Sequence, residues 1–242
     1  MTARKAPQWL TDQTYAHRGL HSFGVPENSR TAAEVAIASG FGIECDIQMS
    51  KDNVPIVFHD WELDRLTEAR GKVANLSAEE LCKLTLAASQ DRIWTLADLL
   101  RLVDGQVPLL IEIKSLPHFA IAEACAAIAR VLDGYNGEFA VMSFDPRMGE
   151  WFTKHSPRYW RGLVATDTLD HGFINAWRRP HAIERAQPDF LAADIRDLPN
   201  ALSDLWRAAD KPLLTWTVRT RELRERASAN ADAPIAEGDG LG

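Results

Sequence analysis

The sequence predicts an α/β fold, a TIM-like (β/α)8 barrel with a small insertion after the third strand. Short β-rich runs alternate with helical patterns almost from end to end, which is typical of a parallel sheet covered by helices. The chain has 242 residues, of which 46% are hydrophobic and 25% charged, and a barrel of roughly 250 residues forms one domain around one core. We therefore expect residues 1–242 to be a single domain, within which residues 61–86 form the insertion.

Eight segments have the composition of strands. They lie near residues 14–17, 42–48, 54–59, 108–114, 139–144, 159–164, 190–195 and 213–218. Helices are expected between them: Thr31 and Glu34 form a capping box that opens one helix, and Gly40 is placed to end it. A second capping box, which begins at Ser77, predicts a short helix inside the insertion, and the apolar spacing over residues 121–132 predicts an amphipathic crossover helix.

The connection between the second and third expected strands is too short for a parallel crossover. Only five residues separate Gln48 from Val54, whereas a parallel crossover needs a dozen or more. Either the barrel lacks one helix, or the two strands form a hairpin around residues 51–53. In the hairpin, Glu44 and His59 lie roughly opposite each other, so both alternatives keep these two residues close.

Composition and charge exclude several classes of function. The formal net charge is −7 and the basic residues are scattered, so the sequence lacks the basic surface of a nucleic-acid-binding protein and favours a small-molecule substrate. No apolar run is long enough for a signal peptide or a membrane span, which favours a cytoplasmic protein. Cys45, Cys82 and Cys125 have unrelated spacings, so we expect small buried side chains rather than disulfides or a zinc cluster.

Carboxylates alternate with apolar residues in two of the expected strands. Successive side chains of a strand point to opposite faces, so Glu44 and Asp46 face the barrel interior while their apolar neighbours meet the helices. The same alternation turns Glu112 and Lys114 inward. Hard divalent cations such as Mg²⁺ and Ca²⁺ take oxygen ligands and hold together carboxylates that otherwise repel each other. The pattern therefore predicts one divalent cation on Glu44, Asp46 and Glu112.

Basic residues near these acids leave a second explanation open. Arg18 and Lys114 offset two of the three negative charges, and a divalent ion would leave the site net positive, which suits a phosphodiester anion. The same residues also fit a metal-free interior layer of ion pairs, in which Glu112 contacts Lys114 and Arg18.

Two histidines stand where barrel enzymes place catalytic groups. His17 ends the first expected strand and His59 ends the third, and the carboxyl ends of barrel strands carry the active site. In-line displacement at phosphorus needs a base for the attacking oxygen and an acid for the leaving oxygen, and imidazole serves both tasks near neutral pH. We assign His17 as the base and His59 as the acid, with the reverse order open, and expect Arg18 to bind the phosphate. The remaining histidines are expected on the surface: His21, His118, His155, His171 and His181.

Together these motifs resemble the glycerophosphodiester phosphodiesterase family. They are His17-Arg-Gly19, Pro26-Glu-Asn28, Glu44-Cys-Asp46, Lys51-Asp52, His59-Asp60, Leu63, Arg65, Thr67 and Glu112-Ile-Lys114. The resemblance is close in order and spacing over residues 17–114 and continues beyond as a strand and helix pattern with Trp216 near the end of the last expected strand. Ser29, Asn53 and Trp94 replace the family's usual Thr, Gly and Pro, and none of these departures removes a catalytic group.

The resemblance implies hydrolysis of glycerophosphodiesters to glycerol 3-phosphate and an alcohol on a TIM-like barrel. It implies a Ca²⁺ or Mg²⁺ ion on the three acids, with His17 and His59 as the acid–base pair. It also implies that the glycerol hydroxyl attacks first, so that water opens a cyclic phosphate. Residues 61–86 correspond to the family's small insertion over the barrel mouth.

Two site residues keep alternative interpretations, and two rival functions share the same motifs. Lys114 either contacts the phosphate or neutralises Glu112, and Trp216 either contacts the substrate, for example a choline group by a cation–π interaction, or packs in the barrel. A related barrel lyase would stop at the cyclic phosphate. A non-catalytic barrel would bind a phosphodiester without turnover.

Overall fold

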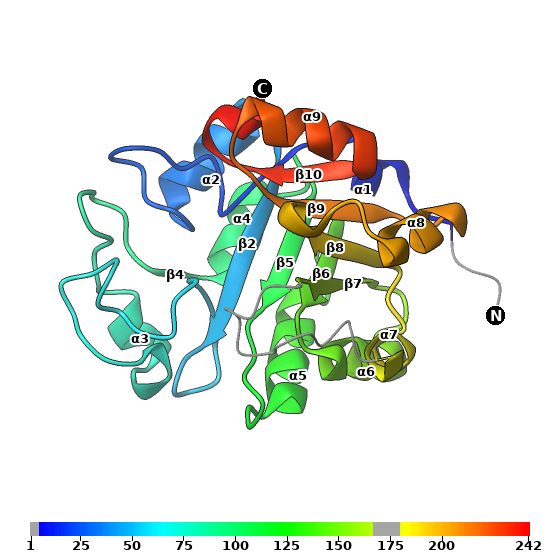
Figure 1. Cartoon of the computed structure of the whole chain (residues 1–242). Helices are drawn as coiled ribbons and strands as arrows, with labels where there is room; N and C mark the ends of the chain where they lie inside the picture. Colours follow the sequence, from blue (N-terminus) through cyan, green and yellow to red (C-terminus); the bar gives the residue numbers. More distant parts are fainter. Residues whose placement is uncertain (1–4, 167–179) are drawn as a thin grey trace.

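The computed structural model describes residues 5–166 and 180–242, and eight parallel strands of this part of the chain close into a barrel (Figure 1). In barrel order they are β1 (Tyr15–Ala16), β2 (Gly42–Met49), β5 (Leu109–Ile113), β6 (Phe139–Ser143), β7 (Trp160–Ala165), β8 (Phe190–Asp194), β9 (Leu213–Val218) and β10 (Ala233–Ala236). The ring closes because β1 pairs with both β2 and β10. The expected (β/α)8 barrel is therefore confirmed.

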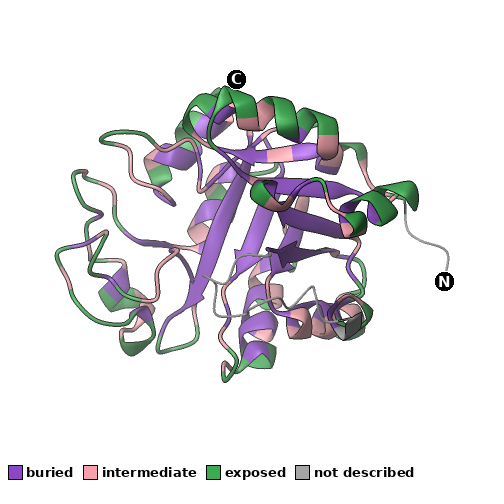
Figure 2. Ribbon diagram, viewed as in Figure 1, coloured by how far each residue is buried: buried purple, intermediate pink, exposed green. Residues whose placement is uncertain are grey.

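Helices cover the outside of the barrel. Their bounds are α1 (Gln8–Thr11), α2 (Arg30–Ala38), α3 (Ala78–Leu81), α4 (Leu96–Val103), α5 (Ile121–Leu132), α6 (Pro146–His155), α7 (Pro180–Ala186), α8 (Ala201–Ala208) and α9 (Arg221–Asn230), with short 3₁₀ turns η1 (Val73–Asn75), η2 (Ile195–Asp197) and η3 (Gly238–Leu241). The outward-facing residues of β2, among them Ile43 and Cys45, pack with Leu96 and Leu99 of α4 in the largest apolar core. The strands are accordingly buried, whereas the outer faces of the helices are exposed (Figure 2).

The strand set differs from the expected one at two places. Residues 54–59 do not form a barrel strand: β3 (Pro55–Val57) is antiparallel to β2, with Ile47 opposite Val57, so the hairpin alternative is the observed one. Asn53 takes the left-handed conformation in its turn, with φ of 60°, which Asn tolerates better than most residues. The eighth barrel strand is instead β10, which was not expected because four residues, two of them alanine and one Pro234, give little strand signal.

Two helix starts test the capping expectations. The capping box at Ser77 is confirmed: the Ser77 side chain accepts from the Glu80 amide, and the Glu80 carboxylate accepts from the Ser77 amide. The box at Thr31 was wrong, since α2 begins one residue earlier and its cap is Ser29, whose Oγ accepts from the Ala32 amide at 3.0 Å. Ser29 is in the extended conformation that a cap needs, so Thr31 falls inside the first turn. Gly40 follows the helix with φ of 73°, as expected.

The interior of the barrel changes from apolar to polar along its axis. Tyr15, Leu110 and Ile235 belong to an apolar cluster inside the barrel, together with Leu10 of α1. Two residues further along the same strands, on the same face, stand His17, Glu112 and Glu237. The carboxyl end of the barrel therefore carries the charged side chains, which is where barrel enzymes place their chemistry.

Residues 61–86 pack outside the barrel, between β3 and a short strand β4 (Trp94–Thr95) that is antiparallel to β3. The segment has an apolar cluster of its own, made of Ile56, Phe58, Leu63, Val73, Leu81, Leu86 and Ile93. Figure 1 shows it, with α3, beside the barrel rather than in its wall. Within the described ranges, no helix has the length and apolar character that crossing a membrane requires.

Candidate active site

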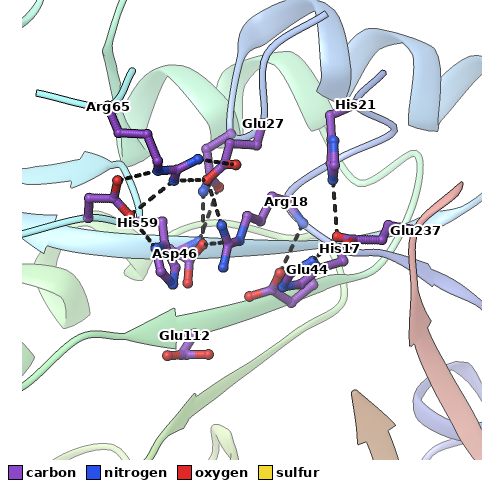
Figure 3. Close-up of polar contacts among 12 residues, drawn as sticks. His17, Arg18, His21, Glu27, Glu44, Asp46, His59, Arg65, Glu112 and Glu237 are labelled. Atoms are coloured by element: carbon purple, nitrogen blue, oxygen red, sulfur yellow. Dashed lines mark hydrogen bonds and ion pairs between the residues drawn. The ribbon is translucent and has the colours of Figure 1, made fainter. Parts of the chain in front are cut away.

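A cavity of about 570 Å³ opens between the carboxyl end of the barrel and the segment at residues 61–86. Its lining includes His59 and Trp61 from one side and Glu112, Lys114 and Phe144 from the barrel. Two predicted catalytic or metal-binding residues and one predicted phosphate contact therefore share one solvent-accessible space. His17, Arg18, Glu44 and Asp46 lie at the same end of the barrel as His59 and Glu112 (Figure 3).

Glu44, Asp46 and Glu112 form a buried cluster at this end of the barrel. Each offers a carboxylate oxygen, and these three atoms lie within 4.8 Å of one another. Parallel pairing of β2 with β5 places Asp46 beside Glu112, so the alternation expected from the sequence brings the acids together. Glu44 accepts a hydrogen bond from the Arg18 amide at 3.0 Å.

The cluster carries opposing electrostatic effects. Burial, with the charges of Asp46 and Glu112, raises the pKa of the Glu44 carboxyl well above its usual value. Burial also acts to raise the pKa of Asp46, but Lys114 and Arg18 oppose it, and this pKa lies well below its usual value. The cluster therefore contains one carboxylate, Asp46, that cationic partners keep ionised, and one, Glu44, whose ionisation the folded protein opposes.

These carboxylates fit a hard divalent cation. All donors are oxygen atoms, the ligand type that Mg²⁺ and Ca²⁺ prefer. Burial, and then the neighbouring charges of Asp46 and Glu112, raise the pKa of Glu44, so the folded protein opposes ionisation of this carboxyl. A cation there would favour the ionised form. Part of the ion-pair alternative is observed as well, because Lys114 Nζ lies 2.8 Å from Asp46 Oδ1 and 2.6 Å from Glu112 Oε1. Arg18, which that alternative placed on Glu112, instead pairs with Asp46 and Glu27.

The Lys114 side chain is only 14% exposed and lies between the two acids, so its removal should destabilise the protein. We expect Lys114→Met to lower the free energy of unfolding by about 3–5 kcal/mol, because it removes the cation paired with the buried Glu112 and leaves Asp46 with Arg18. Lys154→Met is the matched control, since Lys154 forms an exposed pair with Glu150 that is worth at most about 1 kcal/mol. Urea denaturation of the metal-free proteins measures both, and equal losses would show that Lys114 is not needed to neutralise the cluster.

The loop after β1 holds Arg18 against the acids. Arg18 and Asn28 both take left-handed conformations, with φ of 57° and 55°. Asn28 donates to Asp46 Oδ2 at 2.8 Å and accepts from the Asp46 amide at 3.2 Å. Gly19 is required here, because a Cβ at this position would lie 2.9 Å from the Cβ of Ala32. Asn28 therefore ties the loop before α2 to the acid cluster.

Arg18 has donor capacity left over. Its Nη1 donates to Glu27 Oε1 at 2.6 Å, and its Nε lies 3.3 Å from Asp46 Oδ2. That Nε is nevertheless a buried donor without a hydrogen bond of acceptable geometry. An unsatisfied guanidinium donor beside the acid cluster suits a phosphate oxygen.

His17 is held by a carboxylate that the sequence analysis missed. Its Nδ1 lies 2.5 Å from Glu237 Oε2, and His21 Nε2 lies 3.2 Å from the same oxygen. Burial lowers the pKa of His17 against the opposing effect of Glu237, so the ring is neutral near neutral pH. The expectation that His21 is a surface residue was wrong, since it is partly buried and paired with Glu237. Arg219 also binds Glu237: its Nε donates to Glu237 Oε1 at 2.6 Å.

His59 has a similar arrangement at the other side of the site. Its Nδ1 lies 2.7 Å from Asp60 Oδ1, and Gln48, the third inward residue of β2, donates to the His59 carbonyl at 3.0 Å. In the described part of the chain, the Nε2 atoms of His17 and His59 have no hydrogen-bond partner. A ring fixed through Nδ1 leaves Nε2 to exchange a proton with a substrate.

Trp216 lies behind the cavity wall. Its Nε1 donates to the Ala192 carbonyl at 2.9 Å, and its ring packs edge-to-face on Phe144 with centroids 5.5 Å apart. Phe144 lines the cavity and Trp216 supports it, so a direct contact of Trp216 with substrate stays a prediction.

The remaining expectations concern residues away from the site. His118 and His155 are exposed, as expected, whereas the positions of His171 and of the His181 side chain lie outside the described residues. All three cysteines are free, and Cys45 and Cys125 are buried, while Cys82 is only partly so.

Histidines and carboxylates at the carboxyl ends of strands in a closed (β/α)8 barrel define the chain as a barrel enzyme. Comparison with known proteins gives the particular family. The model of the glycerophosphoryl diester phosphodiesterase family matches residues 17–233. The chain belongs to this family of phosphodiesterases.

Individual relatives agree with this family. The glycerophosphodiester phosphodiesterase of Caldanaerobacter subterraneus subsp. tengcongensis is 39% identical over 235 residues, which is 92% of each chain. YhdW of Bacillus subtilis is 37% identical over 109 residues, which cover 42% of this chain and only 44% of YhdW, so that match spans less than half of its relative.

Solved structures of low sequence identity share the fold. An Oleispira antarctica phosphodiesterase, solved in complex with the product sn-glycerol-3-phosphate, superimposes with a TM-score of 0.82 at 23% identity, over 95% of this chain and 93% of that one. A glycerophosphodiester phosphodiesterase from Thermotoga maritima gives 0.74 at 23% identity, over 94% of each chain.

Proposed function

We propose that this protein hydrolyses glycerophosphodiesters to glycerol 3-phosphate and an alcohol, with one divalent cation held by Glu44, Asp46 and Glu112. The observation that carries the proposal is the pair of carboxylate-held imidazoles, His17 and His59, beside a buried three-carboxylate cluster. The relative of 39% identity named for this activity supports it, as does the Oleispira antarctica phosphodiesterase that was solved with sn-glycerol-3-phosphate.

His17 suits the role of base toward the attacking hydroxyl. Burial keeps its ring neutral by lowering its pKa, and Glu237 accepts the Nδ1 hydrogen, which leaves the lone pair on Nε2 to take a proton. His59 suits the role of acid toward the leaving alcohol, because Asp60 stabilises the positive charge of an imidazolium from the Nδ1 side. We infer that the glycerol hydroxyl attacks first and that water then opens the cyclic phosphate.

The phosphate is expected to lie beside the acid cluster and Arg18. When bound, a divalent cation supplies charge neutralisation at a nonbridging phosphate oxygen. Arg18, which Glu27 and Asp46 hold at the acid cluster, is expected to donate to another nonbridging oxygen through its guanidinium. The segment at residues 61–86 contributes Trp61, Glu62, Asp64 and Arg65 to the cavity, so we infer that it covers the mouth of the barrel and restricts the leaving alcohol.

Product analysis tests the proposal directly. The purified protein with Mg²⁺ or Ca²⁺ should release glycerol 3-phosphate from glycerophosphocholine or another member of a glycerophosphodiester panel, with no product when a chelator is present. Phosphorus NMR follows the reaction. A transient cyclic phosphate is compatible with the proposal, a cyclic phosphate as the lasting product would favour the lyase, and no turnover of the panel would leave only a phosphodiester-binding barrel.

A further inference from the structure

We propose that Arg65 is a positioning residue that holds Arg18 and His59 in their working orientations through Glu27 and Asp60. This inference rests on the proposed phosphodiesterase function. Arg65 comes from the segment outside the barrel, whereas Arg18 and Glu27 belong to the loops that flank β1 and α2, so the contact joins parts of the chain that the barrel itself does not connect (Figure 3).

One guanidinium group binds two carboxylates at once. Arg65 Nη1 and Nη2 donate to the two oxygens of Glu27 at 2.9 and 2.7 Å. Arg65 Nε and Nη2 donate to the two oxygens of Asp60 at 2.5 and 3.0 Å. Four hydrogen bonds from one planar group fix the separation and the tilt of both carboxylates.

Each carboxylate then contacts a residue of the proposed reaction. Glu27 Oε1 accepts from Arg18 Nη1 at 2.6 Å, and Asp60 Oδ1 lies 2.7 Å from His59 Nδ1. The series Arg18, Glu27, Arg65, Asp60 and His59 is therefore continuous from the phosphate-binding group to the proposed acid. Moving Arg65 would release both ends together.

Arginine is required at this position by geometry as well as by charge. A lysine carries a single point charge and cannot offer parallel pairs of N–H groups to two carboxylates. Burial acts to raise the pKa of Glu27 and of Asp60, but hydrogen bonds with Arg65, and for Asp60 also with His59, lower both. Both acids stay ionised and able to accept every one of these bonds.

A purely structural role would give a different result. The Arg65 side chain is 49% exposed, and exposed ion pairs contribute little to stability. Because Arg65 forms a bidentate network, its replacement should lower the thermal unfolding midpoint modestly, but kcat should fall by much more than that loss of stability explains. Because Arg65 also lines the cavity, a measurement without substrate is needed to separate positioning from direct contact with the phosphodiester.

The test compares Arg65→Lys and Arg65→Ala with Arg70→Ala in the metal-loaded protein. Arg70 lies on the same segment and contacts Asp64 at 3.5 Å, so it is the matched control. We expect both Arg65 variants to lose about 10- to 100-fold in kcat with glycerophosphocholine, the usual effect of removing a partner that orients a reacting group, and Lys not to rescue Ala. The control should stay within twofold of the wild type.

Proton NMR of the substrate-free protein supplies the second readout. The Nδ1 proton of His59, assigned by its disappearance in His59→Asn, should give a protected downfield signal in the wild type and in Arg70→Ala, and should shift or exchange out in both Arg65 variants. An unchanged signal, or wild-type kcat in Arg65→Lys, overturns the positioning role. If the wild type turns over no diester while the signal still depends on Arg65, the positioning role stands and the proposed function fails.

Discussion

His17→Ala and His59→Ala should each lower kcat for glycerophosphodiester hydrolysis by about 10²- to 10⁴-fold, the range of general acid and base catalysis. Each ring is fixed by a carboxylate through Nδ1, at 2.5 Å for His17 and 2.7 Å for His59. Neither Nε2 atom has a partner in the described ranges. Removing either imidazole removes the proton acceptor or donor of the proposed reaction.

The effect should be on turnover and not on folding. His118→Ala is the control, since His118 is exposed and should retain wild-type kcat. Circular dichroism and thermal unfolding of the three variants should resemble the wild type, with a modest loss for His17→Ala because its ring is buried. Near-normal kcat in either site variant would remove that histidine from the mechanism. A loss that tracks the thermal unfolding midpoint would indicate a structural role instead.

The roles of the two histidines can be separated by changing the leaving group of the substrate. An alcohol of low pKa leaves without help from an acid, so a diester with a nitrophenol leaving group should restore much of the activity of His59→Ala and little of that of His17→Ala. The opposite pattern would reverse the assignment of base and acid, which the sequence leaves open.

Strand alternation made the acid cluster predictable from the sequence. Glu44, Asp46 and Glu112 stand at alternate positions in runs whose other members are Ile, Cys or Leu. The direct pairing of β2 with β5 follows only from the hairpin alternative, in which residues 54–59 leave the barrel wall. The same reasoning found His17. These residues follow from a period of two and from the rule that barrel chemistry lies at strand carboxyl ends.

Glu237 shows where that reasoning stopped. It stands two residues after Ile235, on the inward face of β10, as His17 stands two residues after Tyr15. Inward and outward residues alternate here too, but a strand of four residues that includes Pro234 gives a weak sequence signal. The sequence analysis therefore missed β10 and counted the antiparallel β3 as the eighth barrel strand. Arg65 was noticed as part of a motif, but its bonds to Glu27 and Asp60 join residues 38 and five positions away, a contact that no local pattern encodes.

A divalent cation should raise the stability of the protein through the same acids. Binding to the folded state alone stabilises it by RT ln(1 + [L]/Kd), about 2.7 kcal/mol at a cation concentration 100 times Kd. Calorimetric titration with Mg²⁺ and Ca²⁺ should show binding that Glu44→Gln combined with Asp46→Asn abolishes. Glu123→Gln, an exposed change of the same type on α5, is the control and should bind the cation normally.

Glu44→Gln alone gives the sharper result, because its effect should change sign with the cation. In the metal-free protein the folded state raises the pKa of Glu44, so the native state holds this proton more tightly than the unfolded chain does. Its contribution to stability is present at low pH and is lost as pH rises from the ordinary carboxyl range through the raised pKa.

At neutral pH, Glu44→Gln should therefore raise the metal-free unfolding midpoint, since it removes a buried carboxyl whose ionisation the folded state opposes. With saturating cation the order should reverse, because the wild type gains binding energy and the variant lacks a ligand. Thermal unfolding at pH 7 with chelator and with Mg²⁺ measures both states. If Glu44→Gln shifts the midpoint in the same direction in both, Glu44 is not a ligand, and the ion-pair interpretation of the acid cluster replaces the metal site.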